Sequence, residues 1–480
     1  MLFNSLEFLF FLPTVFIVYW NILSKSLKIQ NSFILLSSYI FYGWWDWRFL
    51  TLIAMSTIID YFVGLRIYNA VENNTKKFYL WISIFFNLSI LAFFKYFDFF
   101  INSWLDLLKL IGFDIQNIIS LEIILPIGIS FYTFQTMSYS IDIYLKKLKP
   151  TKDFIAFASF VSFFPQLVAG PVERAKNLLP QINSTRSFRY MQGIEGLRLI
   201  LWGLFKKVVI ADTLAIHVDM IFENYSLFNG GVLFIGLIYF SFQIYCDFSG
   251  YSDIAIGTAK LFGLALMSNF SYPFFSPTIS EFWRRWHISL SSWFRDYLFI
   301  PLSIQFRNHG KLGICLSTII TYIIIGLWHG ADNKFIIFGL INALYFLPSL
   351  LTNLRIEKIF TLSDLTIRIL NNFRCIRTFI LFSISLVFFR SASVHDGFQY
   401  LKQTLLMLDF PNSNRLGILF IFLLIFIEKY VHHNERDLFS INWIHSKKIK
   451  QLLRILIYYV MVLSIFHFSK FEKPFIYFQF

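Results

Sequence analysis

The feature that most constrains this chain is a series of apolar segments, most of them long enough to cross a bilayer, separated by short loops that collect Lys and Arg. A helix of about 20 apolar residues crosses the hydrocarbon layer because it satisfies its own backbone hydrogen bonds. Of the 480 residues, 57% are hydrophobic and only 15% are charged, too few to cover a soluble surface. These proportions predict an all-α polytopic membrane protein and exclude all-β, nucleic-acid-binding and disulfide-stabilised secreted classes.

The placement of the basic residues predicts the topology. A net charge of +14 would suggest a nucleic-acid partner for a soluble protein, but here the cations lie in short loops, which keeps such loops in the cytoplasm. We expect the loops around Lys25, Lys76 and Lys147 to be cytoplasmic and the N-terminus to be outside. The acidic segment from Asp98 to Glu122 is expected to lie outside.

The pattern becomes irregular after the first five crossings. The segment from Ala156 to Ala169 is apolar but too short to span, contains Pro165, and has basic residues on both sides, which favours a re-entrant hairpin. We count roughly ten to twelve crossings plus re-entrant and interfacial pieces. Because no repeat and no long linker divides the chain, residues 1–480 are expected to form a single transmembrane domain.

One candidate site lies between Ser276 and Tyr297. If this segment forms one helix, Trp283, His287 and Phe294 share a face, together with Leu290 and Ser291. Such a segment is typical of an amphipathic helix at the membrane surface, in which His287 is only a polar filler. The alternative interpretation places His287 in a functional site.

A second candidate is His329, which ends an apolar run beginning near Leu312 and lies between Gly326 and Gly330. An imidazole in an apolar environment stays largely neutral and can accept a proton near pH 7. The glycines allow another backbone or a ligand to approach closely. A general base that deprotonates an alcohol needs this kind of group, although a role in the core or at a helix end explains the residue equally well.

Two further stretches have both a structural and a functional interpretation. Asp247 and Asp253 interrupt an apolar run and are either proton-relay groups or packing partners for buried polar side chains. The stretch from Phe163 to Pro180 is either a Pro/Gly turn anchored by Glu173 and Arg174 or a wall of a substrate channel. The sequence leaves these alternatives open.

The cysteines and the remaining histidines predict no metal site and no disulfide. Three isolated cysteines lack metal-ligand spacing: Cys246, Cys315 and Cys375. Three histidines in a charged loop are interpreted as part of a solvated segment rather than as metal ligands: His432, His433 and His445.

Several separated stretches resemble motifs of the membrane-bound O-acyltransferase (MBOAT) family. They are FFPQLVAGPVERAKNLLPQI, QIYCDFSGYSDIAIG, EFWRRWHISLSSWFRDYLFIPL, GLWHGA and the C-terminal PFIYFQF. The resemblance is to the bacterial branch of the alginate O-acetylation type, with relatives that act on peptidoglycan and other polysaccharides. It implies a helical ring of spans around a central chamber. In this comparison His329 matches the invariant histidine of the family, and His287 matches the second histidine of the polysaccharide branch.

The resemblance also implies an activity. A membrane O-acyltransferase would pass an acyl group, by this likeness acetyl, from a cytoplasmic thioester to hydroxyls of an extracytoplasmic polysaccharide such as alginate, another exopolysaccharide or peptidoglycan. His329 would be the general base, and His287 would orient it, hold the oxyanion or bind the acceptor. Arg284 and Lys176 are candidates for holding the phosphates of a donor such as acetyl-CoA, which is a substrate and not a tightly bound cofactor.

The implied setting is the inner membrane of a bacterium, as a multi-pass protein in contact with lipids. The implied partner is a periplasmic or extracellular acetyltransferase that handles the polymer, and no nucleic acid is involved. Two alternatives remain: D-alanyl transfer to a teichoic-acid-like polymer, whose enzymes carry the same histidine pair, and a non-catalytic transporter or flippase of an acyl carrier.

Overall fold

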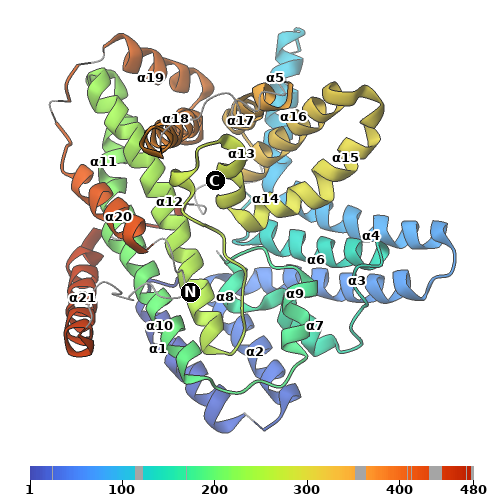
Figure 1. Ribbon diagram of the computed structural model, residues 1–480. Helices are drawn as coiled ribbons and strands as arrows, with labels where there is room; N and C mark the ends of the chain where they lie inside the picture. The colour runs from blue at the N-terminus through green and yellow to red at the C-terminus, as the bar shows by residue number, and fades with distance from the viewer. Residues whose placement is uncertain are drawn as a thin grey trace. The chain divides into compact units, whose positions relative to one another are not determined.

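The computed structural model describes residues 1–23, 25–113, 123–168, 170–351, 364–407, 409–411, 413–431, 446–471 and 473–476. Every regular element within these ranges is a helix (Figure 1). Contacts divide the chain into an N-terminal unit, Met1–Gly196 with Ala255–Met267, and a C-terminal unit, Leu197–Ile254 with Ser268–Phe480. The expectation that the whole chain is one domain stays a prediction.

Helices that are long and apolar enough to cross a membrane occur throughout the described residues. Seven such segments are present: Leu27–Asn69, Asn73–Leu110, Gly230–Leu261, Arg307–His329, Asn333–Leu351, Thr366–Arg390 and Lys448–Phe468. Shorter apolar helices cover Leu6–Ile22 and Phe154–Leu167. The expected multi-pass helical architecture is therefore confirmed, whereas the count of ten to twelve crossings stays a prediction.

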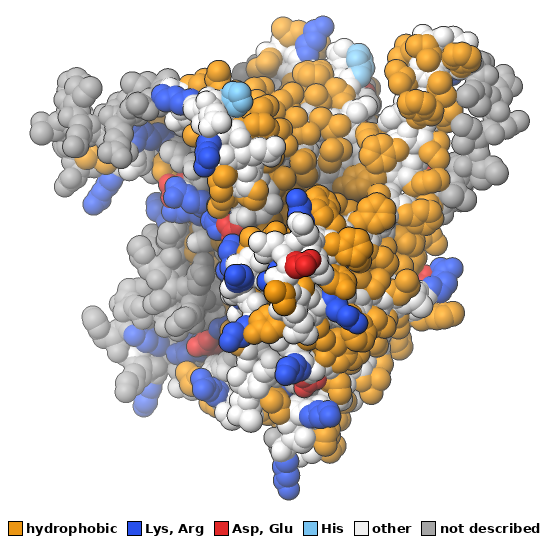
Figure 2. Space-filling view, turned by 90° about the vertical axis from the view of Figure 1, so that its right-hand side faces the viewer, with side chains coloured by type: hydrophobic (Ala, Val, Ile, Leu, Met, Phe, Trp, Pro, Cys, Tyr) orange, Lys and Arg blue, Asp and Glu red, His pale blue; other side chains and the backbone are white. Residues whose placement is uncertain are grey.

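Large apolar side chains on the outside of these helices agree with a lipid environment. Leu312 is 71% exposed, Phe85 is 73% exposed and Phe466 is 72% exposed. Figure 2 shows hydrophobic side chains covering much of the face in view, with Lys and Arg side chains scattered between them. A soluble protein rarely exposes so large an apolar area, because water penalises it, whereas lipid tails do not.

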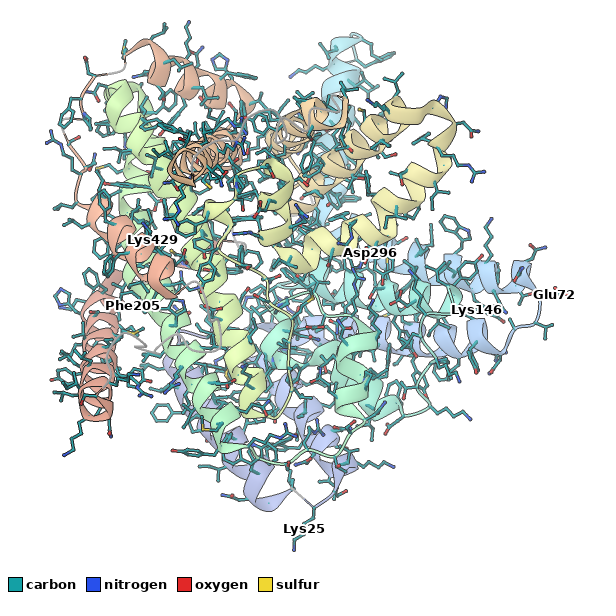
Figure 3. The ribbon with its side chains drawn as sticks, in the orientation of Figure 1. Lys25, Glu72, Lys146, Phe205, Asp296 and Lys429 are labelled. Atoms are coloured by element: carbon teal, nitrogen blue, oxygen red, sulfur yellow. The ribbon has the colours of Figure 1, made fainter. Side chains whose placement is uncertain are left out.

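The N-terminal unit consists mainly of the first nine helices. They are α1 (Leu6–Ile17), α2 (Leu27–Asp46), α3 (Leu50–Asn69), α4 (Asn73–Leu91), α5 (Phe97–Leu110), α6 (Ile129–Tyr144), α7 (Phe154–Ser162), α8 (Phe164–Leu167) and α9 (Ala175–Ile182). Helices α3, α4 and α6 lie side by side (Figure 1). Figure 3 shows Glu72 at the turn between α3 and α4, and Lys146 just beyond the end of α6.

A buried polar network joins α3, α4 and α6. The Asp60 carboxylate is completely buried and accepts hydrogen bonds from Asn87 Nδ2 at 2.7 Å, from Ser140 Oγ at 2.9 Å and from Ser83 Oγ. A carboxylate among apolar helices is costly unless donors surround it. This network therefore explains the polar residues on these apolar helices as packing partners.

One expected boundary in the N-terminal unit is wrong, and one expectation stays a prediction. The segment expected outside from Asp98 onward is helical through Leu110, with Asp98 in the first turn of α5, and its placement outside stays a prediction. The crossing expected from Ile123 begins as a helix only at Ile129, after Gly128 at φ 76°. Asp114 and Glu122 lie outside the described residues.

The segment expected to be re-entrant forms two short buried helices, α7 and α8, which are separated at Phe163. With nine and four residues, neither helix is long enough to cross a bilayer. Ala169 lies outside the described residues, and the re-entrant topology itself stays a prediction.

The C-terminal unit contains the candidate histidines. Its helices are α11 (Asp212–Glu223), α13 (Ile279–Arg285), α14 (Ile288–Phe294), α15 (Ile300–Gln305), α16 (Gly310–His329), α17 (Asn333–Leu351), α18 (Asp364–Arg390), α19 (Val394–Leu406), α20 (Gly417–Val431) and α21 (Lys447–Phe468), with most of α10 (Tyr190–Leu204) and α12 (Gly230–Leu261). The π-helix η4 (Phe205–Ala211) joins α10 to α11. The loop histidines His432, His433 and His445 lie outside the described residues.

Candidate functional site

His329 is the last residue of α16 and is only 5% exposed. Aromatic rings surround its imidazole: the centroid distances are 4.9 Å to Trp328, 5.9 Å to Phe338 on α17 and 5.1 Å to Phe389 on α18. Three helices of the C-terminal unit therefore build the pocket of this histidine. The position expected from the sequence, at the end of an apolar helix, is observed.

The glycines near His329 serve helix packing. A Cβ on Gly326 would collide with the Phe335 carbonyl oxygen, and a Cβ on Gly330 would collide with the Phe335 ring. A Cβ on Gly339 of α17 would collide with the Tyr322 carbonyl oxygen of α16. The close approach that the sequence suggested is therefore made by the backbone and side chains of α17, which fixes the end of α16 that carries His329.

This packing predicts the effect of a single methyl group. Gly326→Ala should lower the free energy of unfolding by about 1–3 kcal/mol, because the backbones of α16 and α17 must move apart. Thermal unfolding of the detergent-solubilised protein measures the effect. Gly193→Ala on α10 is the control, because its Cβ would meet only the Phe188 ring at 3.2 Å. Equal midpoints for the two variants would contradict the packing role of Gly326.

His287 lies at a break between two helices, so the expectation of one continuous helix with a shared face is wrong. α13 ends at Arg285, α14 begins at Ile288, and His287 has a left-handed backbone with φ 44° and ψ 54°. This conformation costs a residue with a Cβ about 1–3 kcal/mol and persists only where the surroundings enforce it. Such strain is common at functional sites.

The chain around Asn269 enforces the break. Ile288 N–H donates to the Asn269 carbonyl oxygen at 2.9 Å, and Ser271 N–H donates to the Arg285 carbonyl oxygen at 3.0 Å. The Asn269 side chain accepts from Ser289 Oγ at 2.6 Å and donates to Ser252 Oγ on α12 at 3.1 Å. These bonds use backbone groups that a continuous helix would have paired internally.

Trp328 is the neighbour that the two histidines share. Its ring centroid lies 5.7 Å from that of His287 and 4.9 Å from that of His329. His287 is completely buried, and burial lowers its pKa to about 3, so its imidazole is neutral. The fold therefore brings the two candidate residues to one aromatic cluster. Trp328 lies in the GLWHGA stretch, but the sequence indicated no role for it, because aromatic residues make up 20% of the chain.

The two carboxylates on α12 form ion pairs with adjacent lysines of η4. Asp247 Oδ1 lies 2.9 Å from Lys207 Nζ, and Asp253 Oδ2 lies 2.7 Å from Lys206 Nζ. Lys207 Nζ also contacts Asp212 Oδ1 at 2.6 Å. The structure thus favours the packing interpretation of Asp247 and Asp253. π-helices often occur at functional sites, and here the wider turn places consecutive lysines against different carboxylates.

The two basic residues that are candidates for holding the donor phosphates lie in different units. Lys176 is an exposed residue of α9 in the N-terminal unit. Arg284 is an exposed residue of α13 and lines a cavity of about 390 Å³ in the C-terminal unit. Glu173, from the same motif as Lys176, is buried and accepts a hydrogen bond from the Met267 N–H, which supports the structural interpretation of that turn.

The cavity beside Arg284 has mixed chemistry. Its wall combines Arg295, the Ser291, Ser292, Thr318 and Thr321 hydroxyls, and the aromatic rings of Trp283, Phe294, Phe299, Tyr322 and Phe346. Two wall residues are close in sequence to the histidines: Trp283 lies four residues before His287, across the helix break, and Ile325 precedes His329 by one turn of α16. Trp283 Nε1 is buried and has no hydrogen-bond partner among the described residues.

Comparison with known proteins places the chain in a family. Residues 144–394 match the profile of MBOAT, the membrane-bound O-acyltransferase family. The chain is 38% identical to the probable alginate O-acetylase AlgI of Pseudomonas aeruginosa over 82% of this chain and 73% of that protein. It is 33% identical to the peptidoglycan O-acetyltransferase of Helicobacter pylori over 72% and 69% of the two chains. A teichoic acid D-alanyltransferase of Bacillus subtilis is 28% identical over 45% and 57%.

These matches agree with the sequence motifs, and the matched region contains both histidines. With its apolar spanning helices, the chain belongs to the membrane-bound O-acyltransferase family and is a multi-pass membrane acyltransferase.

Proposed function

We propose that this protein transfers an acetyl group from a thioester donor, supplied on the cytoplasmic side, toward hydroxyls of an extracytoplasmic polysaccharide. The observation that carries the proposal is the placement of two buried histidines against one tryptophan. The names of the relatives at 33% and 38% identity support acetyl as the acyl group and a polysaccharide as the acceptor.

In the proposed reaction His329 is the general base. Its imidazole takes the proton of the attacking hydroxyl, the hydroxyl oxygen forms a bond to the thioester carbonyl carbon, and the carbon–sulfur bond breaks. The thiolate that leaves recovers the proton, so the products are an ester and a free thiol. Proton transfer of this kind contributes roughly 10²–10⁴-fold to the rate, and the positioning of donor and acceptor contributes the rest.

His287 has the supporting role. Its fixed backbone and complete burial suit a group that holds the reacting carbonyl oxygen or orients the substrate. A neutral imidazole carries one N–H donor and one acceptor nitrogen, so it can donate to a developing oxyanion without a net charge. The aromatic surroundings of both histidines exclude water, which protects a thioester from hydrolysis.

The cavity of about 390 Å³ is the proposed place for part of the donor. Arg284 and Arg295 suit the phosphates of acetyl-CoA. Lys176 stays a second candidate for phosphate contact. This protein is proposed to lie in the inner membrane of a bacterium. On the acceptor side, its proposed partner is a periplasmic or extracellular acetyltransferase.

Ester analysis of cell-surface polymers tests this function. A strain without the gene should lose ester-linked acetate from one surface polysaccharide, and a plasmid copy should restore it. Loss of ester-linked D-alanine instead would support the teichoic-acid alternative. Unchanged ester content of every polymer, with an acyl carrier retained inside the cell, would contradict acyl transfer and support a conduit.

A further inference from the structure

The short segment Lys473–Ile476 is anchored in the C-terminal unit at several points. Lys207 Nζ donates to the Lys473 carbonyl oxygen at 2.9 Å. Ile476 N–H donates to Asp247 Oδ2 at 2.6 Å. Lys473 Nζ lies 3.0 Å from Asp219 Oδ2. The backbone of the segment is therefore fixed on both sides of Phe475 by groups that come from η4 and α12.

The anchoring groups form a charge-balanced cluster. Its cations are Lys207, Arg390 and Lys473, and its anions are Asp212, Asp219 and Asp247. Lys207 pairs with two of the anions, Asp212 and Asp247, whereas Arg390 and Lys473 both pair with Asp219. We call these six residues the charge cluster. Arg390 directly follows Phe389, whose ring contacts His329, so the charge cluster also adjoins the wall of the second histidine.

Phe475 connects this anchor to His287. The Phe475 ring is completely buried, with centroids 4.4 Å from Tyr251 and 5.8 Å from Phe248. The Phe248 ring in turn meets the His287 imidazole edge to face, with centroids 4.6 Å apart. On one side of the imidazole, two consecutive ring contacts, Phe475 to Phe248 and Phe248 to His287, therefore lead from the anchored segment to His287.

We propose that the segment Lys473–Ile476 is a positioning element for His287: the charge cluster fixes the segment, and Phe475 holds Phe248 against the imidazole. Phe475 touches no reacting atom and acts through His287. The catalytic part of this inference rests on the proposed function, whereas the packing part does not. The inference follows from the buried aromatic contacts: removal of the Phe475 ring opens a cavity beside Phe248 and takes away one of its ring neighbours, while Phe270 at 5.1 Å stays in place.

Chemical modification tests the packing part without any enzyme assay. Diethyl pyrocarbonate is applied to the full-length protein in detergent, and mass spectrometry follows carbethoxylation of His287, with the exposed His309 as internal reference. His287 should be protected in the wild type. Phe475→Ala should raise its modification rate by about tenfold or more, and Phe475→Leu, which keeps most of the apolar volume, should raise it by less than about threefold.

A matched control separates this effect from general loosening. Phe157 is as buried as Phe475 but packs against Tyr61, Tyr139 and Phe160 in the N-terminal unit. Phe157→Ala should leave the His287 modification rate unchanged relative to His309. An unchanged rate in Phe475→Ala, or an equal increase in Phe157→Ala, would overturn the proposal.

A double-mutant cycle tests the catalytic part. Phe475→Ala should lower kcat by about tenfold with a donor KM within about twofold of wild type, since positioning acts on the transition state. In a His287→Ala background the same change should alter the residual rate by less than about twofold, because the group it positions is absent. Equal losses in both backgrounds would overturn positioning through His287. If His287→Ala alone has wild-type activity, the proposed catalytic role of His287 is wrong. The carbethoxylation rates then still test whether Phe475 holds Phe248 against the His287 imidazole.

Discussion

His329→Gln should abolish acyl transfer while leaving the amount of membrane-inserted protein unchanged. Glutamine has a volume similar to that of histidine and keeps a polar group in the aromatic pocket, but its amide cannot take the proton of a hydroxyl. The loss should be at least about 10²–10⁴-fold, the usual contribution of a general base. The measurement is polymer-bound acetate in a strain that lacks the gene and carries each variant at matched expression.

Two other histidines serve as comparisons for His329. His309→Gln changes an exposed residue in a short 3₁₀ helix and should retain wild-type acetate levels. His287→Ala should lower acetyl transfer and can leave a residual rate, because His287 is proposed to hold the carbonyl oxygen or orient the substrate and not to take the proton. Near-wild-type acetate with His329→Gln would show that the general-base assignment is wrong.

Lys207→Met should destabilise the protein by about 3–5 kcal/mol, since it leaves two buried carboxylates without their cation. Lys207 is 1% exposed and lies within 3 Å of both Asp212 and Asp247. Burial alone would lower the pKa of Lys207, but the carboxylates of Asp247 and Asp212 outweigh it and raise the pKa above its usual value. The side chain is therefore charged, and methionine replaces its length but not its charge.

The control for Lys207 is another lysine that is paired with a carboxylate. Lys260 Nζ lies 2.7 Å from Glu195 Oε2, but both side chains are partly exposed. Lys260→Met should cost no more than about 1 kcal/mol, as expected for a pair that water screens. Thermal unfolding in detergent compares the two variants. Similar unfolding midpoints for Lys207→Met and Lys260→Met would contradict the larger stabilisation expected from the buried ion pairs of Lys207.

The sequence was most informative for the long apolar helices. The apolar run that Asp247 and Asp253 interrupt corresponds to one long helix, α12 (Gly230–Leu261). The same logic placed His329 at the end of a span, where α16 ends. These predictions hold because a helix in lipid must satisfy its backbone locally, so composition along the chain decides the element.

The features that escaped sequence reasoning depend on contacts between distant segments. The break at His287 exists because the backbone and side chain of Asn269 pair with residues 288 and 289, which no helical period reveals. In the same way, no local pattern reveals that Lys206 and Lys207 pair with Asp253 and Asp247 of α12. Tertiary packing overrides local pattern at these places.

The shared neighbourhood of the two histidines could be predicted only in part from the sequence. Their identity as candidates followed from residue type, setting and family resemblance, but their common neighbour Trp328 followed only from the fold. Gly326 shows the same limit, because its spacing indicated a close approach and only the structure identified the approaching group as the Phe335 backbone.

The central claim is that thioester cleavage and ester formation occur at His329, and inverted membrane vesicles test it most directly. Acetyl-CoA labelled in the acetyl group is added outside the vesicles, and two products are measured together: free thiol outside and labelled ester on polymer inside. Vesicles with the wild-type protein should produce thiol and ester in equal amounts, and vesicles with His329→Gln should produce neither above background. Wild-type thiol release by His329→Gln, or labelled carrier that crosses with its thioester intact, would contradict the account.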